Sequence, residues 1–382
     1  MEPKATHPGQ RRQELALLAL FLAVIGGVFF FDLIYALAAP PKPKSIQDVL
    51  RGKWMRRLDS FFVGEYSCMF QGWRTVVTEG LYTLTGEVQP GVFMGMDGWL
   101  SIQAEMVDRT LSAKKKDQLY TESVASLARI RDYMTAHGVE VFMLVPPNRL
   151  RIYPEYFFKD CRVPSYMRTS YKDLIHKLQV AHFETIDLEE VFREEKRKDS
   201  MQGILYHTAD HHWTSRGCLA ACQQVTDRIR ILHPEWCNTA LGSIHLNEPF
   251  KTTTETTLSK NLGFSNRKLI QFLARPVMYF TVSYQRPFTA VEKDETPFLL
   301  IGDSFAHSFP GIMVEYLEYD LQAPVQGAYV HDGMPFWFKS DRFVKKKPSY
   351  LIWEIWEANF TAGSVVGIDD AMLHPKEPMK MN

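Results

Sequence analysis

The chain has 382 residues, which is enough to bury a substantial core in one large domain or two ordinary ones. Lysine plus arginine and aspartate plus glutamate both number 44, so the basic surplus of a nucleic-acid-binding protein is missing and we expect no such partner. The five cysteines show no repeated C-x-x-C spacing, so we expect no structural metal; their pairing in disulfides stays open.

The N-terminal segment predicts export. From Leu15 to Ala39 the chain is apolar except for Asp32, and basic residues precede the run. Its length suffices to span a bilayer, which favours a signal anchor in a transmembrane helix. A small-x-small pattern at Ala36-Leu37-Ala38 keeps a cleaved signal peptide as the alternative. In either case the rest of the chain is expected outside the cytoplasm, in the periplasm and tethered to the inner membrane if the anchor is retained.

After the anchor, residues 40–90 are interpreted as a linker and lead-in, and helices then alternate with apolar strands. This alternation predicts an α/β fold, with a largely parallel sheet covered by helices on both faces. We expect a catalytic domain over 91–360, an insertion near 238–295 and a tail over 361–382. The expected helices are 114–137, 166–181, 215–232 and 311–317, and the expected strands are 139–145, 183–188, 298–301, 325–330 and 350–355.

A candidate nucleophile follows the strand that is expected at 298–301. There the chain runs Gly302-Asp303-Ser304 before a predicted helix. A turn from a strand to a helix can expose a serine hydroxyl while backbone N–H groups face a developing oxyanion. An N-cap serine in an ordinary loop is the alternative for so short a motif.

A candidate base and its carboxylate lie in the segment Tyr206–Thr214. A serine hydroxyl needs a base such as histidine, and that base needs a carboxylate to fix its tautomer. Asp210 and His212 supply this pair two residues apart, and in an extended segment both side chains would point to the same side. A metal site is the weaker alternative, because no further ligand occurs at the usual helical spacing.

These motifs resemble the alginate O-acetyltransferase family (AlgJ and AlgX type) among the SGNH-like hydrolases. Four segments occur in the family's order: GMDGWL at 95–100, VPPNRLRIYP at 145–154, DHHWT at 210–214 and GDSF at 302–305. Aspartate and histidine precede the serine here, which is the permuted order of this family, whereas ordinary GDSL esterases begin with the serine. Arg149 departs from the family, which usually has lysine there.

The resemblance implies a permuted SGNH-type acetyltransferase with Asp210, His212 and Ser304 as its catalytic triad. It also implies a polysaccharide acceptor, no cofactor, and an acetyl donor delivered by a membrane-bound O-acyltransferase partner. The side chains expected to face the substrate are Arg149, Tyr153, His211, Trp213 and His307. Two alternatives stay open: an acetylesterase that uses the same triad with water as acceptor, and a non-catalytic, membrane-tethered protein that binds or assembles polysaccharide.

Overall fold

The computed structural model describes residues 92–106, 111–198, 203–236, 244–252, 276–307, 313–329 and 347–369. All of them belong to one of the two compact units of the chain, which spans Gln89–Lys260 and Arg267–Asn382. The apolar run at 15–39 lies outside the described residues. Within the described ranges, no helix combines the length and the hydropathy that crossing a membrane requires.

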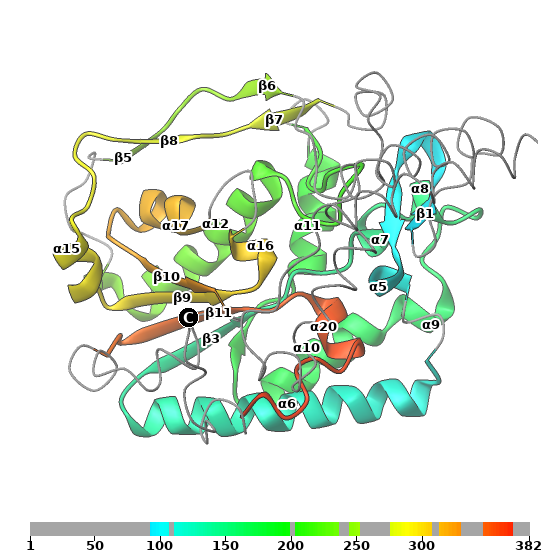
Figure 1. The fold of residues 1–382 in the computed structure, drawn as a ribbon, viewed down its shortest axis with the longest axis horizontal. Helices are drawn as coiled ribbons and strands as arrows, with labels where there is room; N and C mark the ends of the chain where they lie inside the picture. Colours follow the sequence, from blue (N-terminus) through cyan, green and yellow to red (C-terminus); the bar gives the residue numbers. More distant parts are fainter. Residues whose placement is uncertain are drawn as a thin grey trace, which may run out of the picture. The chain divides into compact units, whose positions relative to one another are not determined.

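The core of the described unit is a sheet of five parallel strands, as predicted (Figure 1). The order across the sheet is β10 (Gln326–Tyr329), β9 (Phe298–Gly302), β11 (Tyr350–Glu354), β3 (Glu140–Leu144) and β4 (Glu184–Thr185). In register, Ile352 of β11 lies between Leu300 of β9 and Phe142 of β3. Because all five strands run the same way, their carboxyl ends meet at one edge, where ligands bind in such sheets.

Helices cover both faces of this sheet, which explains why its strands are almost continuously apolar. Helices α6 (Ala113–Ala136) and α10 (Ser170–Val180) lie on one side in Figure 1, and α12 (Ser215–Leu232) and α17 (Met313–Leu321) lie on the other. Successive strand residues point to opposite faces. Phe142 and Ile352 therefore join the core cluster that contains α12 and α17, while Met143 and Trp353 join the cluster that contains α6 and α10. All four side chains are fully buried.

Local capping chemistry sets the helix boundaries that the sequence predicts best. The Ser112 hydroxyl accepts the Lys115 N–H at the start of α6, and Gly138 follows the helix with a φ of +77°. At the start of α12 the Thr214 hydroxyl accepts the Gly217 N–H. The predicted helix at 215–232 therefore agrees with the structure residue for residue.

Three expected elements differ from the structure, and one of them, the helix expected at 311–317, runs on to Leu321 in α17. The helix expected at 166–181 is interrupted at Thr169, giving α9 (Ser165–Arg168) and α10, and at the break the Met167 carbonyl accepts hydrogen bonds from the Arg151 guanidinium and the Ser170 hydroxyl. The strand expected at 183–188 is shorter, because Leu188 already begins α11 (Leu188–Lys198), a helix that the sequence analysis missed.

The part of the predicted insertion that the structure describes forms antiparallel pairs outside the main sheet. Strand β5 (Ile244–Leu246) pairs with β8 (Val282–Tyr284), and β6 (Phe250–Thr252) pairs with β7 (Val277–Tyr279). Helix α15 (Ala290–Glu295) then leads into β9. The remaining short elements near the site are β1 (Val92–Met94), η1 (Met96–Gly98), β2 (Leu100–Ile102), α5 (Gln103–Met106), α7 (Arg149–Ile152), α8 (Pro154–Phe157), α16 (Ser304–His307) and α20 (Glu357–Thr361).

Candidate active site

The candidate nucleophile lies in a tight turn at the carboxyl end of β9. Gly302 ends the strand and Ser304 begins α16. A Cβ atom at position 302 would lie 2.3 Å from the Ala306 Cβ and 2.7 Å from the Glu354 Oε2, so only glycine fits without a shift of its neighbours. The sequence therefore needs glycine here because the backbone passes close to α16 and β11.

Asp303 anchors this turn to the end of the neighbouring strand. One carboxyl oxygen accepts the Phe305 N–H at 2.9 Å, and the other accepts the Trp356 N–H at 3.0 Å and the Asn359 amide at 2.7 Å. The Asp303 N–H donates to the Glu354 Oε2 at 3.0 Å. These bonds hold Ser304 in a fixed position against the junction of β11 and α20.

The candidate base lies in a closed loop rather than in the extended segment that we expected. Tyr206 and Trp213 form an antiparallel bridge, and the His207 N–H donates to the His212 carbonyl at 3.1 Å. The chain thus turns back on itself between these residues. Asp210 and His212 meet because one oxygen of Asp210, Oδ1, accepts both the backbone N–H of His212, at 3.2 Å, and its ring Nδ1–H, at 2.6 Å.

The three predicted triad residues converge on one another. The His212 Nε2 lies 2.8 Å from the Ser304 Oγ, while the His212 Nδ1 lies 2.6 Å from the Asp210 Oδ1. If Nδ1 carries the proton that is shared with Asp210, Nε2 has its lone pair free to accept the Ser304 hydroxyl proton. Asp210 and His212 are both buried, so these bonds are shielded from water. The arrangement can activate a serine for attack on a carbonyl carbon.

The electrostatics of the loop keep Asp210 charged and two neighbouring imidazoles neutral. Burial alone would raise the pKa of Asp210, but the hydrogen bond from His212 and the nearby imidazoles outweigh it and hold this pKa well below its ordinary value. Burial lowers the pKa of His207 to about 4, and burial followed by repulsion from His212 lowers the pKa of His211 to about 3. At neutral pH, Asp210 is therefore ionised and both His207 and His211 are neutral.

The atoms of Asp210, His211 and His212 that could ligate a metal lie within 4.8 Å of one another. The Asp210 Oδ1 is, however, already within hydrogen-bond distance of the His212 Nδ1. The His212 Nε2 is likewise within hydrogen-bond distance of the Ser304 Oγ. The geometry therefore suits proton transfer, since a metal ion would have to displace these hydrogen bonds.

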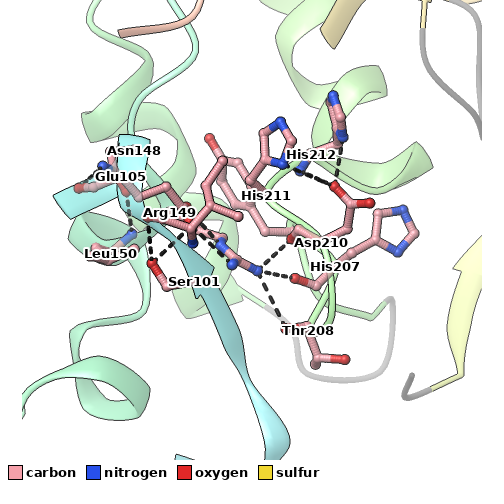
Figure 2. A network of polar contacts seen from close by, with 12 residues as sticks. Ser101, Glu105, Asn148, Arg149, Leu150, His207, Thr208, Asp210, His211 and His212 are labelled. Carbon is pink, nitrogen blue, oxygen red and sulfur yellow. Dashed lines mark hydrogen bonds and ion pairs between the residues drawn. The ribbon is translucent and has the colours of Figure 1, made fainter. Parts of the chain in front are cut away.

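Three residues that we expected to face the substrate lie inside the protein instead. Arg149 is fully buried, with its guanidinium between Glu105 and the carbonyls of the 207–210 loop (Figure 2). The Tyr153 hydroxyl accepts the Leu205 N–H at 2.9 Å, and its ring centroid lies 4.8 Å from that of Trp99. The Trp213 indole N–H donates to the Phe305 carbonyl at 2.9 Å. These buried side chains bond to the backbone around Asp210, His212 and Ser304, and this corrects the prediction that they contact substrate.

The other two candidates keep some access to solvent. The His211 side chain is 20% exposed, and its ring centroid lies 3.9 Å from that of His212 and 5.0 Å from that of Trp356. His307 is half-buried at the end of α16 and lines a cavity of about 580 Å³ together with Tyr284 and Phe288. A contact of His211 or His307 with substrate stays a prediction.

Comparison with known proteins agrees with this architecture. A family model described as "SGNH hydrolase-like domain, acetyltransferase AlgX" matches residues 92–357. The "Probable alginate O-acetylase AlgJ" of Pseudomonas fluorescens is 24% identical over 335 residues, which cover 84% of this chain and 81% of that protein.

Two solved structures share the fold. The O-acetyltransferase domain of Pseudomonas putida AlgJ superposes with a TM-score of 0.57 and 21% identity, covering 72% of this chain and 93% of that one. Pseudomonas aeruginosa AlgX gives 0.50 and 19%, covering 69% of this chain and 61% of that one. The sheet is therefore of the SGNH-hydrolase type, and because the family model spans most of the sequence, this chain belongs to the family of SGNH hydrolase-like acetyltransferases of the AlgX type.

Proposed function

We propose that this protein transfers an acetyl group, through an acetyl-Ser304 intermediate, onto hydroxyl groups of an exopolysaccharide or cell-surface polysaccharide. The observation that carries the proposal is the 2.8 Å separation between the His212 Nε2 and the Ser304 Oγ, with Asp210 on the far side of the imidazole. The similarity to proteins named alginate O-acetylase supports a polysaccharide acceptor.

In the first half of the reaction, the Ser304 Oγ attacks the acetyl carbonyl of the donor and passes its proton to the His212 Nε2. The tetrahedral intermediate collapses, the bond to the donor's leaving group breaks, and His212 returns the proton to that group. Asp210 holds the imidazole in the required tautomer and stabilises the imidazolium. The Ser304 backbone N–H begins α16, so it has no carbonyl partner within that helix and can face the oxyanion.

In the second half, His212 removes a proton from a sugar hydroxyl, whose oxygen attacks the acetyl carbon of acetyl-Ser304. The ester bond to Ser304 breaks, and the serine recovers its proton from His212. An acetylesterase would run the same step with water. The two functions therefore differ in whether a bound sugar excludes water from the acetyl-enzyme.

The proposal includes a place and a partner. The apolar run at 15–39 supports a domain tethered to the inner membrane and facing the periplasm. In that compartment the acetyl group has to arrive across the membrane, and a membrane-bound O-acyltransferase partner would deliver it. A reporter that is active only in the periplasm, fused after Asn382, tests the location. A silent periplasmic reporter beside an active cytoplasmic one would refute it.

The chemistry is tested with 4-nitrophenyl acetate as a surrogate donor. Ser304→Ala should lower the rate of nitrophenolate release by on the order of 10⁴ to 10⁶, the usual cost of losing a triad member. Ser283→Ala, which removes a hydroxyl from β8, serves as the control and should leave the rate unchanged. If wild type and Ser304→Ala are equally inert, the non-catalytic binding function gains support.

The acceptor is tested by adding oligosaccharides of the host's own polymer to the same assay. Acetyl transfer predicts a gain in mass on the oligosaccharide and a matching fall in free acetate. If acetate is released rapidly while no oligosaccharide is ever acetylated, the protein is an esterase.

A further inference from the structure

A buried ion pair lies beneath the loop that carries Asp210 and His212. Arg149 of α7 and Glu105 of α5 both have fully buried side chains. The Arg149 Nε lies 2.8 Å from one carboxylate oxygen of Glu105, and Nη2 lies 3.1 Å from the other, so the two groups meet in a two-pronged pair (Figure 2). A buried ion pair is costly to desolvate, and it persists only where further hydrogen bonds satisfy both partners.

Those further bonds go from Arg149 to the catalytic loop. Its Nη1 donates to the carbonyls of His207, at 2.6 Å, and Asp210, with a longer contact of 3.4 Å to Thr208. Three backbone carbonyls of this one loop, those of residues 207, 208 and 210, therefore point their oxygens at one nitrogen (Figure 2). Glu105 is in turn held from the other side by the Ser101 hydroxyl, at 3.0 Å, and the Ile102 N–H, at 3.1 Å.

We propose that Arg149, backed by Glu105, is the positioning residue that fixes Asp210 and His212 in register with Ser304. The inference rests on the proposed function of this triad. Arg149 holds the Asp210 carbonyl directly, while the carboxyl group of the same residue bonds to His212. It also holds the His207 carbonyl, and the N–H of His207 bonds to the carbonyl of His212. Both links into His212 thus begin at the guanidinium.

The shape of the guanidinium suits this task. Its planar fork bonds Glu105 through two nitrogens and directs a third at the loop, which a lysine ammonium, as a compact point charge, does only in part. The charge of Arg149 also acts on the neighbouring imidazoles: after burial and other nearby groups, it is a further cause that lowers the pKa of His207 and His211. It thereby helps to keep the imidazoles of His207 and His211 neutral.

The experiment compares Arg149→Met, Arg149→Lys and Glu105→Gln in the full-length protein, with 4-nitrophenyl acetate as substrate. A shift of about 1 Å at a catalytic group can cost on the order of 100-fold in rate, so we expect Arg149→Met to lower kcat about 100-fold with little change in KM. Arg149→Lys should recover about tenfold of that loss. Active serines are counted by titration with a sulfonyl fluoride, so that kcat refers to folded protein alone.

A matched control separates positioning from stability. Arg216 is also a buried arginine, and it donates to the carbonyls of Gly203 and Glu195 rather than to the 207–210 loop. Arg216→Met and Arg149→Met should both lower the melting temperature, while in Arg216→Met kcat per active serine should stay at the wild-type value. The downfield proton NMR signal of the His212 Nδ1–H, bonded to Asp210, should move or broaden in the Arg149 variants and stay in place in Arg216→Met.

The inference is overturned if the Arg149 variants have wild-type kcat per active serine and an unmoved Nδ1–H signal. Should Arg149→Met fail to fold, Arg149→Lys and Glu105→Gln decide the matter by the same two readouts. Ser304→Ala, assayed in parallel, distinguishes the two levels of failure. Full activity of Ser304→Ala would refute the proposed function. An inactive Ser304→Ala together with fully active Arg149 variants would refute only the positioning role.

Discussion

Glu354 is a fully buried carboxyl group directly behind the turn that carries Ser304. It accepts the Asp303 N–H at the end of β11. Burial, and then the neighbouring Asp303 carboxyl, raise the pKa of Glu354 well above its ordinary value. We therefore expect Glu354 to be protonated in the folded protein near neutral pH, which avoids two buried negative charges beside Ser304.

This shift predicts how stability depends on pH. A carboxyl group whose pKa is raised by folding contributes its full stabilisation of the folded state only below its unfolded pKa, near 4.5. This stabilisation is lost as pH rises through the pKa of the folded state. Each unit of the difference corresponds to about 1.4 kcal/mol. Glu354→Gln keeps the shape without the titration. Its free energy of unfolding should therefore fall less than that of the wild type between pH 5 and pH 8, as measured by urea unfolding.

The control for this measurement is Glu122→Gln, on the exposed face of α6, which should leave the pH dependence of the wild type unchanged. A Glu354→Gln curve parallel to the wild-type curve across this range would show that Glu354 is ionised in the folded state.

At the scale of residues, the sequence indicated the candidate triad but not the buried side chains that hold its loop in place. Asp210, His212 and Ser304 belong to short motifs whose residue types follow from the reaction, and they meet as expected. Arg149 belongs to a similar motif but lies below the loop. Sequence shows that an arginine is present and not whether it is buried, and its partner Glu105 is 44 positions away with no motif to mark it.

At the scale of elements, α12 shows how closely the first turn of a helix packs on the site. A Cβ atom at Gly217 would lie 2.3 Å from the Leu205 carbonyl oxygen and 2.9 Å from the Trp213 Cβ. Both neighbours flank the loop that carries Asp210 and His212. Glycine at this point lets the helix pack directly against the two ends of the loop.

Gly217→Ala should destabilise the protein, although the same change inside a helix normally stabilises it by about 1 kcal/mol. Overpacking against backbone atoms costs about 1–3 kcal/mol, and here it should outweigh helix propensity. Urea unfolding measures the difference. Gln223→Ala, at an exposed position of the same helix, is the control and should change stability by less than about 0.5 kcal/mol. A more stable Gly217→Ala variant would contradict the close packing.

The elements that were predicted well have local signals, and those that were missed depend on tertiary contacts. Helix α12 begins at a threonine cap and follows the apolar spacing to its end. The break at Thr169 depends on Arg151, which no local pattern connects to Met167. Helix α11 does carry apolar residues at helical spacing, Leu188, Val191 and Phe192, and this signal could have revealed it.

At the scale of the whole described unit, the sheet is closed by a strand from late in the chain. Strand β11 lies between β9 and β3 and supplies Glu354 next to the turn that carries Ser304. Truncation after Pro348 should therefore yield no folded domain, because β3 and β9 lose their common neighbour and Asp303 loses its bonds to Trp356 and Asn359. Truncation after Asp369 keeps every described element and should fold.

Circular dichroism melting and titration of the active serine distinguish these two forms. A cooperative melt with a reactive Ser304 in the shorter form would refute the central role of β11. The parallel sheet itself could be predicted from the alternation of helices and strands. The order of its strands could not, because that order depends on which strands pack side by side and leaves no mark in local sequence.

The late position of the central strand in the sequence also determines when, during synthesis, the site can form. A growing chain contains Asp210, His212 and Ser304 well before residues 350–354 are made, yet the turn that carries Ser304 lacks its bonds to Glu354, Trp356 and Asn359 until β11 inserts. Acyl-transfer activity should therefore appear abruptly, in the same step that completes the sheet.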